Sequence, residues 1–516
     1  MIYALVAYFL TFAVAAWLVA CYFIHMFQLE AYLKKQYLKW VKTELVKNII
    51  PKMIPMFVFA VVLMFNSGIT TFALLSVLNL LCCYIFRPKK AKKAFVYTAR
   101  VKRLLTTTVL LNFVVLIPAS VFGLYFIFPI IFVLSELVIL LAAYINDPVE
   151  KAVRNKYINE AKRIISARKK NLTVIGITGS YGKTSTKFFL AKILSKKYNV
   201  FMTPASYNTT MGVVKAIREM LKPTHEIFIC EMGARNTGEI KEICDIVLPD
   251  YGIITSVGPQ HLETFKTIEN VIKTKFELFD AVKDKQKVFL NADNSYIYEK
   301  ASAENSVFYG INNKSAAYVA ENITCSSSGT DFVLNMPCEK LNLSTRLLGE
   351  HNVLNIAACC AVAHKLGVDS RDIAISVRML EPVEHRLQMF DGGDVVIIDD
   401  SFNSNPSGAK AALDVLSKFD GTRILVTPGM IELGEKQEEL NRAFGAQAAK
   451  VCDYIYIVGK VNYNAIAEGI TSGQFDVENR LFAVSSPEQA VNMARMLQET
   501  SKKYVLLEND LPDNFR

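Results

Sequence analysis

The sequence lacks the cysteine spacing of a zinc-binding or disulfide-rich protein. Its ten cysteines form no CxxC pair and no Cys/His group with the spacing of a zinc site. Two adjacent pairs, Cys82-Cys83 and Cys359-Cys360, lie in apolar or alanine-rich surroundings. Cysteine in such surroundings behaves as a small hydrophobic residue. We therefore expect buried, free thiols in a reducing compartment.

A basic face with interleaved aromatic residues is also missing from the part of the sequence that follows the long apolar runs. The formal net charge of +10 would by itself fit a nucleic-acid-binding protein. The charge is concentrated, however, because residues 87–103 carry eight Lys or Arg and no acid, directly beside long apolar runs. That distribution is typical of the cytoplasmic side of a membrane protein. We expect no nucleic-acid partner.

The first long apolar run has no charged residue at all. Residues 2–24 contain no Asp, Glu, Lys or Arg, and the first lysine of the chain is Lys34. A secretory signal peptide carries positive charge before its apolar core. We therefore interpret this run as an uncleaved membrane span.

Two longer apolar stretches follow, at residues 49–86 and 104–145. Each is too long for one membrane span and long enough for two spans joined by a tight turn. The first is interrupted near Asn66-Ser67-Gly68 and the second near Gly123. The sequence thus predicts an α-helical transmembrane region over residues 1–146 with about five spans.

Beyond a charged helical linker predicted at 147–170, apolar strands alternate with amphipathic helices. This alternation predicts an α/β fold with a largely parallel sheet and helices on both faces. We place a central domain at 171–382 and a second α/β domain at 383–516, with the boundary near Glu381-Pro382. The predicted strands are 172–177, 199–203, 226–231, 251–256, 287–291, 395–400, 424–427, 454–458 and 504–507.

A glycine-rich segment joins the first of these strands to a helix and has the composition of a phosphate-binding loop. Glycines allow a tight turn close to the ligand, and the backbone amides and the positive end of the helix face the anion. Lys183 can reach the β- and γ-phosphates, and the hydroxyl of Thr184 can bind Mg²⁺. The predicted phosphate-binding residues are Gly179, Ser180, Gly182, Lys183, Thr184 and Ser185.

The phosphate-binding loop fixes the expected orientation in the membrane. Five spans place residues 25–50, residues 87–103 and the basic segment after Asp147 on one face. We expect that face to be the cytoplasmic side of the cell (inner) membrane, because the loop needs ATP, and the N-terminus to be outside. Residues 25–50 fit an interfacial helix or a solvated connector. Residues 51–55 contain two prolines and a lysine, so a re-entrant or tilted helix fits there as well.

Two further side chains follow predicted strands at the edge where ligands bind in parallel sheets. Glu231 follows directly after the apolar run 227–230. A phosphate-binding loop needs a second residue that holds Mg²⁺ at this place, and Glu231 could be that residue. A buried acid without function fits the position as well. His261 follows the strand at 252–255 after a short loop. A single histidine at such a place is more often structural.

Segments after the loop resemble, in order, those of the Mur ligase superfamily, the ATP-dependent amide ligases of peptidoglycan synthesis. Residues 178–184 are similar to the phosphate loop of that family. The other similar segments are 206–212, 231–235, 258–263, 274–278, 291–293, 349–355, 384–387, 399–406 and 430–434. The resemblance covers about 171–510 and is greatest to members that add D-alanyl-D-alanine to a UDP-N-acetylmuramoyl-tripeptide.

This resemblance implies a P-loop central domain, a Rossmann-like C-terminal domain, and ATP and Mg²⁺ as cofactors. By resemblance, Lys183 and Thr184 hold phosphates and Mg²⁺, Glu231 is a Mg²⁺ ligand, and His261 holds a second Mg²⁺. Lys275 stands where members of the family carry a carbamylated lysine, whose negative charge helps to position that metal and the γ-phosphate. Lys183, Lys275 and His261 are thus the expected catalytic residues.

The resemblance also implies where the rest of the nucleotide lies. Asn291 and Asn355 are expected near the adenine, and Arg386 and Asp400 are expected to contact the nucleotide across the gap between the two domains. The implied reaction converts a carboxylate into an acyl phosphate, which an amine then attacks. The implied partners are a carboxylate acceptor (a lipid-linked or UDP-linked muramyl peptide), an amine donor such as D-Ala-D-Ala, and membrane lipid.

The sequence departs from the family in two places that bear on the substrates. Apolar helices stand where members carry a UDP-binding domain. Residues 506–513 read Leu-Leu-Glu-Asn-Asp-Leu-Pro-Asp in place of a Lys-Gly-Ser-Arg type segment. One alternative is therefore a ligase of another polymer, such as a poly-γ-glutamate synthase. Another is a nucleotide-dependent membrane scaffold or transporter without ligase activity, which product analysis would distinguish.

Overall fold

The computed structural model divides into two compact units, one built from residues up to Lys156 and one from Tyr157–Leu511. The structure describes residues 2–510 apart from 45–49, 51–52, 55–56, 59–60, 62–68, 87–93, 125–126, 205–206, 261, 403, 432, 472 and 474. The break predicted at residues 66–68 and the first part, 87–93, of the basic run at 87–103 lie outside this described part.

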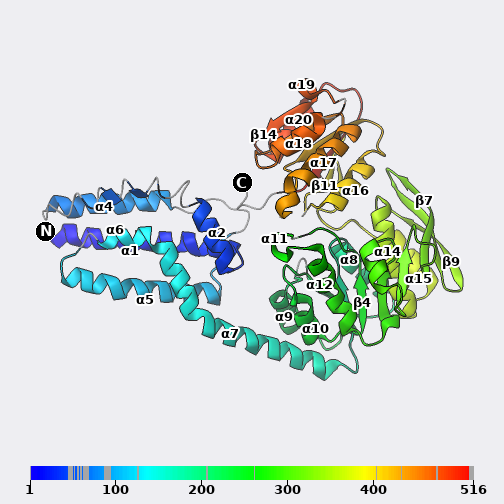
Figure 1. Ribbon diagram of the computed structural model, residues 1–516, viewed down its shortest axis with the longest axis horizontal. Coiled ribbons are helices and arrows are strands. Elements are labelled where there is room, and N and C mark those ends of the chain that lie inside the picture. Colours follow the sequence, from blue (N-terminus) through cyan, green and yellow to red (C-terminus); the bar gives the residue numbers. More distant parts are fainter. Residues whose placement is uncertain are drawn as a thin grey trace. The chain divides into compact units, whose positions relative to one another are not determined.

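The first unit is entirely helical. Helices α4 and α5 both pack along α1 (Figure 1). One continuous apolar core joins them, and a polar contact crosses it, since Asn79 Nδ2 of α4 lies 3.2 Å from Thr11 Oγ1 of α1. The helices that the structure describes here are α1 (Ile2–Leu29), α2 (Lys34–Glu44), α4 (Ile69–Ile85), α5 (Ala99–Val121), α6 (Ile127–Val133) and α7 (Ser135–Arg168), the last of which continues past Lys156 into the second unit.

Helix length supports fewer membrane spans than the apolar runs predict. Among the described helices, α1 and α5 are long and apolar enough to cross a membrane, by length and composition alone. Helix α4 is apolar but has only 17 residues. The predicted interruption at Gly123 is present, because α5 ends at Val121 and α6 begins at Ile127. The second half of that hairpin is divided between the seven-residue α6 and the start of α7, where Glu136 is buried.

The predicted start of a linker helix at Asp147-Pro148 is wrong. Helix α7 runs without interruption from Ser135 through Pro148 to Arg168. Side chains on either side of the proline anchor this part of the helix: Asp147 pairs with Lys34, and Glu150 accepts two hydrogen bonds from Arg103, at 2.7 and 2.9 Å. These contacts favour the continuous helix although proline removes one of its hydrogen bonds.

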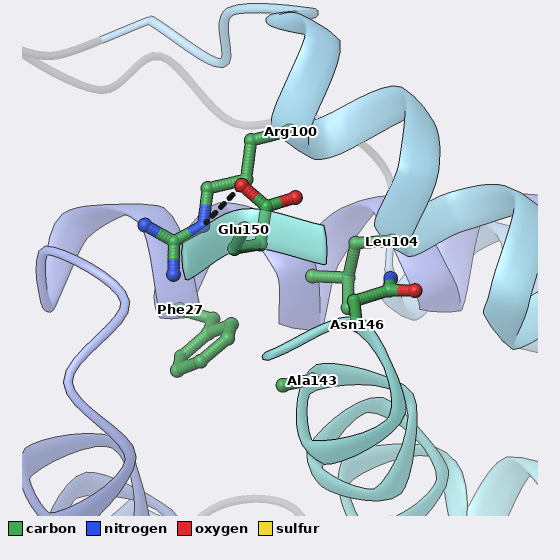
Figure 2. A pocket seen from close by; sticks show the side chains of 6 residues that line it. All are labelled: Phe27, Arg100, Leu104, Ala143, Asn146 and Glu150. Atoms are coloured by element: carbon green, nitrogen blue, oxygen red, sulfur yellow. Dashed lines mark ion pairs between the residues drawn. The ribbon is translucent and has the colours of Figure 1, made fainter. Parts of the chain in front are cut away.

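A small pocket lies beside these ion pairs (Figure 2). Its volume is about 10 Å³, room for roughly one water molecule. Arg100 closes one side, with its Nε 3.8 Å from Glu150 Oε2. The pocket is therefore too small for a nucleotide or a peptide.

The second unit contains two α/β domains. The sheet of the central domain has the order β2-β3-β1-β4-β5-β6-β7-β8-β9, and its first seven strands run parallel. The strands are β1 (Thr173–Thr178), β2 (Val200–Met202), β3 (Ile227–Glu231), β4 (Tyr251–Ile254), β5 (Val288–Asn291), β6 (Val307–Gly310), β7 (Tyr318–Ser326), β8 (Gly329–Met336) and β9 (Glu339–Thr345). The five predicted strands of this domain correspond to β1 to β5, whereas β6 and β7, which continue the parallel pairing, were not predicted.

Strands β8 and β9 extend the sheet antiparallel to β7, and the alternation of strands and helices did not predict them either. Helices cover both faces of the sheet, with α8, α14 and α15 in one apolar core and α7, α9, α10, α12 and α13 in the other. Their bounds are α8 (Lys183–Leu194), α9 (Thr210–Glu219), α10 (Glu239–Val247), α11 (Leu262–Phe265), α12 (Ile268–Ala281), α13 (Ser295–Ala301), α14 (Glu350–Lys365) and α15 (Ser370–Arg378), with a 3₁₀ turn at Lys285–Lys287.

The C-terminal domain is built on a second sheet of order β10-β11-β15-β12-β13-β14, parallel except for β10. Its strands are β10 (Gln388–Asp391), β11 (Val395–Asp400), β12 (Thr422–Thr427), β13 (Tyr454–Val458), β14 (Leu481–Val484) and β15 (Lys503–Glu508). Its helices are α16 (Pro406–Leu416), α17 (Gln437–Val451), α18 (Tyr463–Thr471), α19 (Val477–Arg480) and α20 (Pro487–Met496), with a 3₁₀ turn at Gly434–Lys436.

The cysteines behave largely as the sequence predicts. All ten are free thiols. Cys359 and Cys360 are fully buried in α14, and Cys82 is buried in α4, whereas Cys83 is only half-buried.

Candidate functional site

The loop between β1 and α8 can be built only with glycine at two positions. Gly179 and Gly182 have φ angles of +155° and +79°, which other residues rarely adopt. A Cβ on Gly179 would lie 2.1 Å from Thr255 Oγ1, and one on Gly182 would lie 2.6 Å from Asn355 Oδ1. The loop is therefore tightly packed against the end of β4 and against α14.

Hydrogen bonds hold this loop in place before any ligand arrives. The backbone N–H of Ser180 donates to the carbonyl of Ser256 at 2.8 Å, and that of Tyr181 donates to Ser256 Oγ at 2.7 Å. Ser180 Oγ donates to the carbonyl of Gly258 at 3.1 Å. Gly182 caps α8, so the first turn of that helix, with Thr184 and Ser185, presents its free amides at the loop. The result is a preformed anion cradle.

Lys183 points back into the loop. Its Nζ donates to the carbonyls of Gly179 and Ser180, at 2.6 and 3.2 Å. The pKa of the Lys183 ammonium is lowered to about 8, because burial and the charge of Arg386 lower it by more than the Glu231 carboxylate raises it. A phosphate in the loop would supply the negative charge that this ammonium lacks.

The lowered pKa of Lys183 predicts a pH dependence of nucleotide binding. Above about pH 8 the free protein loses the Lys183 proton, so binding of an anionic nucleotide must take up a proton there. The apparent affinity for ATP should fall about tenfold per pH unit above that value and stay level below it. Isothermal titration between pH 6.5 and 9.5 measures this. Lys183→Arg keeps its positive charge at high pH, so its affinity for ATP should stay level to a higher pH than that of the wild type. The same fall in affinity above about pH 8 in this variant would show that Lys183 is not the titrating group.

Glu231 lies at the end of β3, beside the loop, with its side chain almost completely buried. Its Oε1 accepts hydrogen bonds from Thr184 Oγ1 at 3.1 Å and from Asn208 Nδ2 at 3.0 Å. Its Oε2 lies 3.0 Å from Lys187 Nζ. Although burial raises its pKa, the charges of Lys187 and Lys183 and these hydrogen bonds lower it, so the carboxyl is held ionised.

Lys187 is a residue of this site that sequence reasoning missed. Its side chain is fully buried and forms the only ion pair that the structure gives Glu231 among the described residues. It is one helical turn beyond Lys183, and a lysine at that spacing on an otherwise apolar helix face was the available signal.

Thr184 and Glu231 together fit a Mg²⁺ site. Mg²⁺ in phosphate-binding proteins is held by one or two protein oxygens and completes its shell with phosphate oxygens and water. The Thr184 hydroxyl and the Glu231 carboxylate are in direct contact at the mouth of the cradle, which provides these oxygens. Across the described residues, no three His, Cys, Asp or Glu side chains converge to hold a metal. His261, the expected ligand of a second metal, lies outside the described residues.

Lys275 is buried inside α12, and the structure records no hydrogen bond or ion pair between it and any described residue. Burial lowers the pKa of its ammonium well below the usual value, and the positive charge of Lys183 acts in the same direction. The charges of Glu277 and Glu239 act in the opposite direction, and burial is the larger effect, so the charged form of the side chain is disfavoured. A neutral amine is the form that reacts with carbon dioxide to give a carbamate.

Both asparagines expected near the adenine form hydrogen bonds with residues that build the site. Asn291 Nδ2 donates to the carbonyl of Thr255 at 2.8 Å, which ties the end of β5 to the end of β4. Asn355 Oδ1 accepts from Thr186 Oγ1 at 3.3 Å and lies over Gly182. These contacts place Asn355 against the phosphate loop.

Arg386 and Asp400 lie together at the edge of the C-terminal domain. Burial raises the pKa of Asp400 to about 6, while Arg386 lowers it, and the N–H of Leu387 donates to Asp400 Oδ1 at 3.3 Å. His385 and Leu387, on either side of Arg386, both have positive φ angles, 58° and 48°. Such strained backbone fixes the direction of a side chain. The charge of Arg386 acts on Lys183 and Glu231 as well as on Asp400.

Two sequence models of one family match this second unit. The Mur ligase middle domain matches residues 177–363, and the model described as "Mur ligase, glutamate ligase domain" matches residues 385–507. The chain belongs to the Mur ligase family. The helices of the first unit lie outside both matches, so this Mur ligase carries an N-terminal region additional to the matched core.

Curated relatives of this Mur ligase include UDP-N-acetylmuramoyl-tripeptide–D-alanyl-D-alanine ligases. The one from Buchnera aphidicola is 32% identical over 301 residues, covering 57% of this chain and 66% of the relative. The one from Escherichia coli is 30% identical over 296 residues, covering 56% and 65%. The chain thus spans about two-thirds of the length of the curated relatives that it matches.

Solved structures agree with this family assignment. MurF from Acinetobacter baumannii superposes with a TM-score of 0.62 at 26% identity, over 69% of this chain and 77% of that one. MurF ligase from Thermotoga maritima, solved in complex with ADP, gives a TM-score of 0.61 at 26% identity, over 69% and 80%. The α/β fold predicted from the sequence is therefore confirmed.

Proposed function

We propose that this Mur ligase forms an amide bond at the expense of ATP, through an acyl phosphate, in the assembly of peptidoglycan precursors. The observation that carries the proposal is the preformed cradle of residues 179–185 with the Glu231 carboxylate at its mouth. The acceptor is a muramyl-peptide carboxylate, UDP-linked or lipid-linked. The similar proteins are named for adding D-alanyl-D-alanine, and we take a peptide-like amine as the donor class.

The residues of the cradle have different roles in phosphoryl transfer. The loop amides and Lys183 bind the phosphates, and Lys183 balances the charge that develops as the γ-phosphoryl group moves to the acceptor carboxylate. Thr184 and Glu231 hold Mg²⁺, which would screen the phosphate oxygens from the incoming carboxylate. Lys187 keeps Glu231 ionised and fixes its orientation.

The C-terminal domain completes the nucleotide site. Arg386 and Asp400 contact the nucleotide from the edge of that domain. The strained backbone on either side of Arg386 fixes the direction of its guanidinium group. With both domains on the nucleotide, water is kept from the acyl phosphate until the amine attacks. Asn291 and Asn355 hold the strand ends and the loop that shape the adenine side.

A direct assay tests the proposed reaction. The full-length protein, purified in detergent or nanodiscs, is given ATP, Mg²⁺ and UDP-linked or lipid-linked muramyl tripeptide, with hydroxylamine as a trap for an acyl phosphate. We expect phosphate release and a hydroxamate, both dependent on the acceptor. Absence of acceptor-dependent ATP turnover with either muramyl peptide would contradict the proposal, and turnover with glutamate alone would favour a poly-γ-glutamate ligase.

The burial of Lys275, which lowers the pKa of its ammonium, supports a carbamate at this position. A carbamate would give Lys275 the negative charge to act with His261 beside a second Mg²⁺ and the γ-phosphate. Protein kept in CO₂-free buffer should lose at least about tenfold in ligase activity and regain it when bicarbonate is added. Intact-mass measurement of the central domain at neutral pH checks for the modification. Activity that is independent of bicarbonate would contradict the carbamate.

We further propose that the first unit attaches the ligase to the cell membrane. Helices α1 and α5, whose length and composition suit a membrane span, support this, as do the basic residues beside the apolar runs. The finer arrangement of about five spans, with a cytoplasmic ligase and an external N-terminus, is tested by labelling single cysteines from outside intact cells. We expect a cysteine introduced at residue 2 to be labelled and one introduced in place of Lys192 not to be labelled. The reverse result would contradict the proposed orientation.

A further inference from the structure

The turn that carries Arg386 has an unusual backbone conformation. His385 and Leu387, on either side of Arg386, have φ angles of +58° and +48°, in the left-handed region that residues with a Cβ avoid. Neither is a glycine or an asparagine, which adopt this conformation more readily. Two such residues in one turn cost free energy and persist only when other contacts hold them. The contacts of this turn therefore determine the direction of Arg386.

Strand pairing brings the 385–387 turn against the end of β11. Strand β10 begins directly after the turn and pairs antiparallel with β11, with Gln388 opposite Asp399. In an antiparallel pair, the residues before Gln388 lie beside the residues after Asp399. The turn therefore lies at the carboxyl end of β11, and ligands of parallel sheets bind at that end of the strands.

Both acids at the end of β11 bind this turn. Asp399 Oδ2 lies 2.7 Å from His385 Nδ1, and a carboxylate at this distance accepts a hydrogen bond from the ring N–H. Asp400 Oδ1 accepts a hydrogen bond from the N–H of Leu387 at 3.3 Å. Two neighbouring side chains of β11 thus hold the residues on both sides of Arg386.

Asp399 is itself fixed in place. The residue is buried, and its Oδ1 accepts a hydrogen bond from the N–H of Ser401 at 3.0 Å. The second ring nitrogen of His385 lies 3.7 Å from Glu384 Oε1, but the side chain of Glu384 is 82% exposed. An exposed ion pair contributes little energy. The contact with Asp399 is therefore the one that fixes the ring of His385.

Arg386 has contacts of its own, and Asp399 is not one of them. Its guanidinium lies over the ring of Phe402, 4.9 Å from the ring centre, and its charge interacts with Asp400 and Glu231. Among the described residues, the structure records no hydrogen bond or ion pair between Arg386 and Asp399. Any effect of Asp399 on Arg386 must therefore pass through the 385–387 turn.

Resting on the proposed function, in which Arg386 contacts the nucleotide, we propose that Asp399 and His385 are positioning residues of the nucleotide site. The hydrogen bond between them holds residue 385 in the left-handed region and so keeps the guanidinium of Arg386 directed at the nucleotide. Without this bond the turn relaxes toward ordinary backbone angles, and nucleotide binding must restore the original direction. A side chain that is already in its bound direction loses less conformational entropy on binding.

Substitutions at both ends of this hydrogen bond test the proposal. The affinity of the full-length protein for ATP is measured by isothermal titration with Mg²⁺ present. Asp399→Ala and His385→Ala should each weaken binding about tenfold, which is the effect expected for a hydrogen bond to a charged group. The double variant should weaken binding no further, because both substitutions remove the same contact.

Two further variants show that the effect is specific to this contact. Asp399→Asn should keep most of the wild-type affinity, because its amide can still form a hydrogen bond with Nδ1 of a neutral ring. Asp453→Ala is the matched control. Asp453 lies just before β13 of the same sheet and pairs with Arg423 at 3.4 Å, so its removal also breaks an ion pair of this domain. This control should bind ATP as the wild type does.

A double-mutant cycle with Arg386 separates positioning from general packing. Arg386→Ala should itself weaken ATP binding at least about tenfold, because it removes a charged contact. In the Arg386→Ala background, Asp399→Ala should then change the affinity by less than about twofold, since no guanidinium remains to be positioned. A tenfold loss that persists in this background would show that Asp399 acts on the packing of the domain and would overturn the proposal.

The outcomes separate this inference from the proposed function, because ATP binding tests the first and hydroxamate formation tests the second. Wild-type affinity for ATP in Asp399→Ala, His385→Ala or Arg386→Ala would overturn the positioning role, and the ligase function would stand if the wild type forms hydroxamate. Absence of hydroxamate from a wild type whose ATP affinity depends on Asp399 and His385 as expected would refute the ligase reaction and leave the positioning role standing.

Discussion

Lys183→Ala is expected to lower ATP-dependent product formation by about 10²–10³-fold. The Nζ of Lys183 is the charged donor in the preformed loop, bonded to the carbonyls of Gly179 and Ser180 until phosphate replaces them. Its loss leaves the γ-phosphoryl group without a positive charge in a buried site, where solvent compensates poorly. Both phosphate release and hydroxamate formation measure the effect, because the acyl phosphate forms before the amine reacts.

A second lysine of the same helix controls for general effects of the substitution. Lys192 is exposed on α8, and Lys192→Ala should keep wild-type activity. The fold of Lys183→Ala should also persist, because the packing of the loop does not depend on the ligand. Its circular dichroism spectrum and melting temperature measure this. Wild-type hydroxamate formation by Lys183→Ala would refute the phosphate-binding role of the loop.

Lys187→Met is expected to destabilise the ligase unit by about 3–5 kcal/mol. Lys187 and Glu231 form an ion pair of 3.0 Å in which both side chains are almost wholly buried. Removing the lysine leaves an ionised carboxylate in the interior without its cation. Thermal unfolding in the presence of a chelator, followed by near-UV circular dichroism, measures the loss.

Two comparisons make this result specific. Lys215→Met removes an ion pair with Glu219 whose side chains are about half exposed, and should cost less than about 1 kcal/mol. Added Mg²⁺ should restore part of the stability of Lys187→Met and affect the wild type less, because the freed Glu231 carboxylate can bind it. A variant that melts like the wild type would show that the pair carries little energy.

Much of the ligase unit follows from the order of local patterns. The apolar runs that predicted strands at 172–177, 226–231, 251–256 and 287–291 became β1, β3, β4 and β5 with shifts of a residue or two. The antiparallel strands β7 to β9 were missed because their alternating polar residues resemble exposed loops when read without their partners. Local sequence therefore predicted β1 to β5 and not β6 to β9.

In the first unit, local signals were less reliable. Asp147-Pro148 resembles a helix start, yet α7 passes through it, because ion pairs from α2 and α5 anchor the helix on both sides of the proline. Apolar length likewise predicted hairpins of two spans, while the structure divides the stretch after Gly123 between a short helix and the start of α7. Packing between helices decided both cases.

The sequence by itself determined the phosphate-binding loop, since glycine at 179 and 182, lysine at 183 and threonine at 184 have meaning from their spacing alone. The resemblance to the Mur ligases followed from that loop together with the segments that come after it in order. Only the tertiary structure decided which charges balance one another. Lys187 pairs with Glu231, Lys275 has no partner among the described residues, and Glu508 keeps an unpaired oxygen. Burial and the approach of distant segments set the energy of a charge, and neither is encoded in the neighbouring residues of the chain.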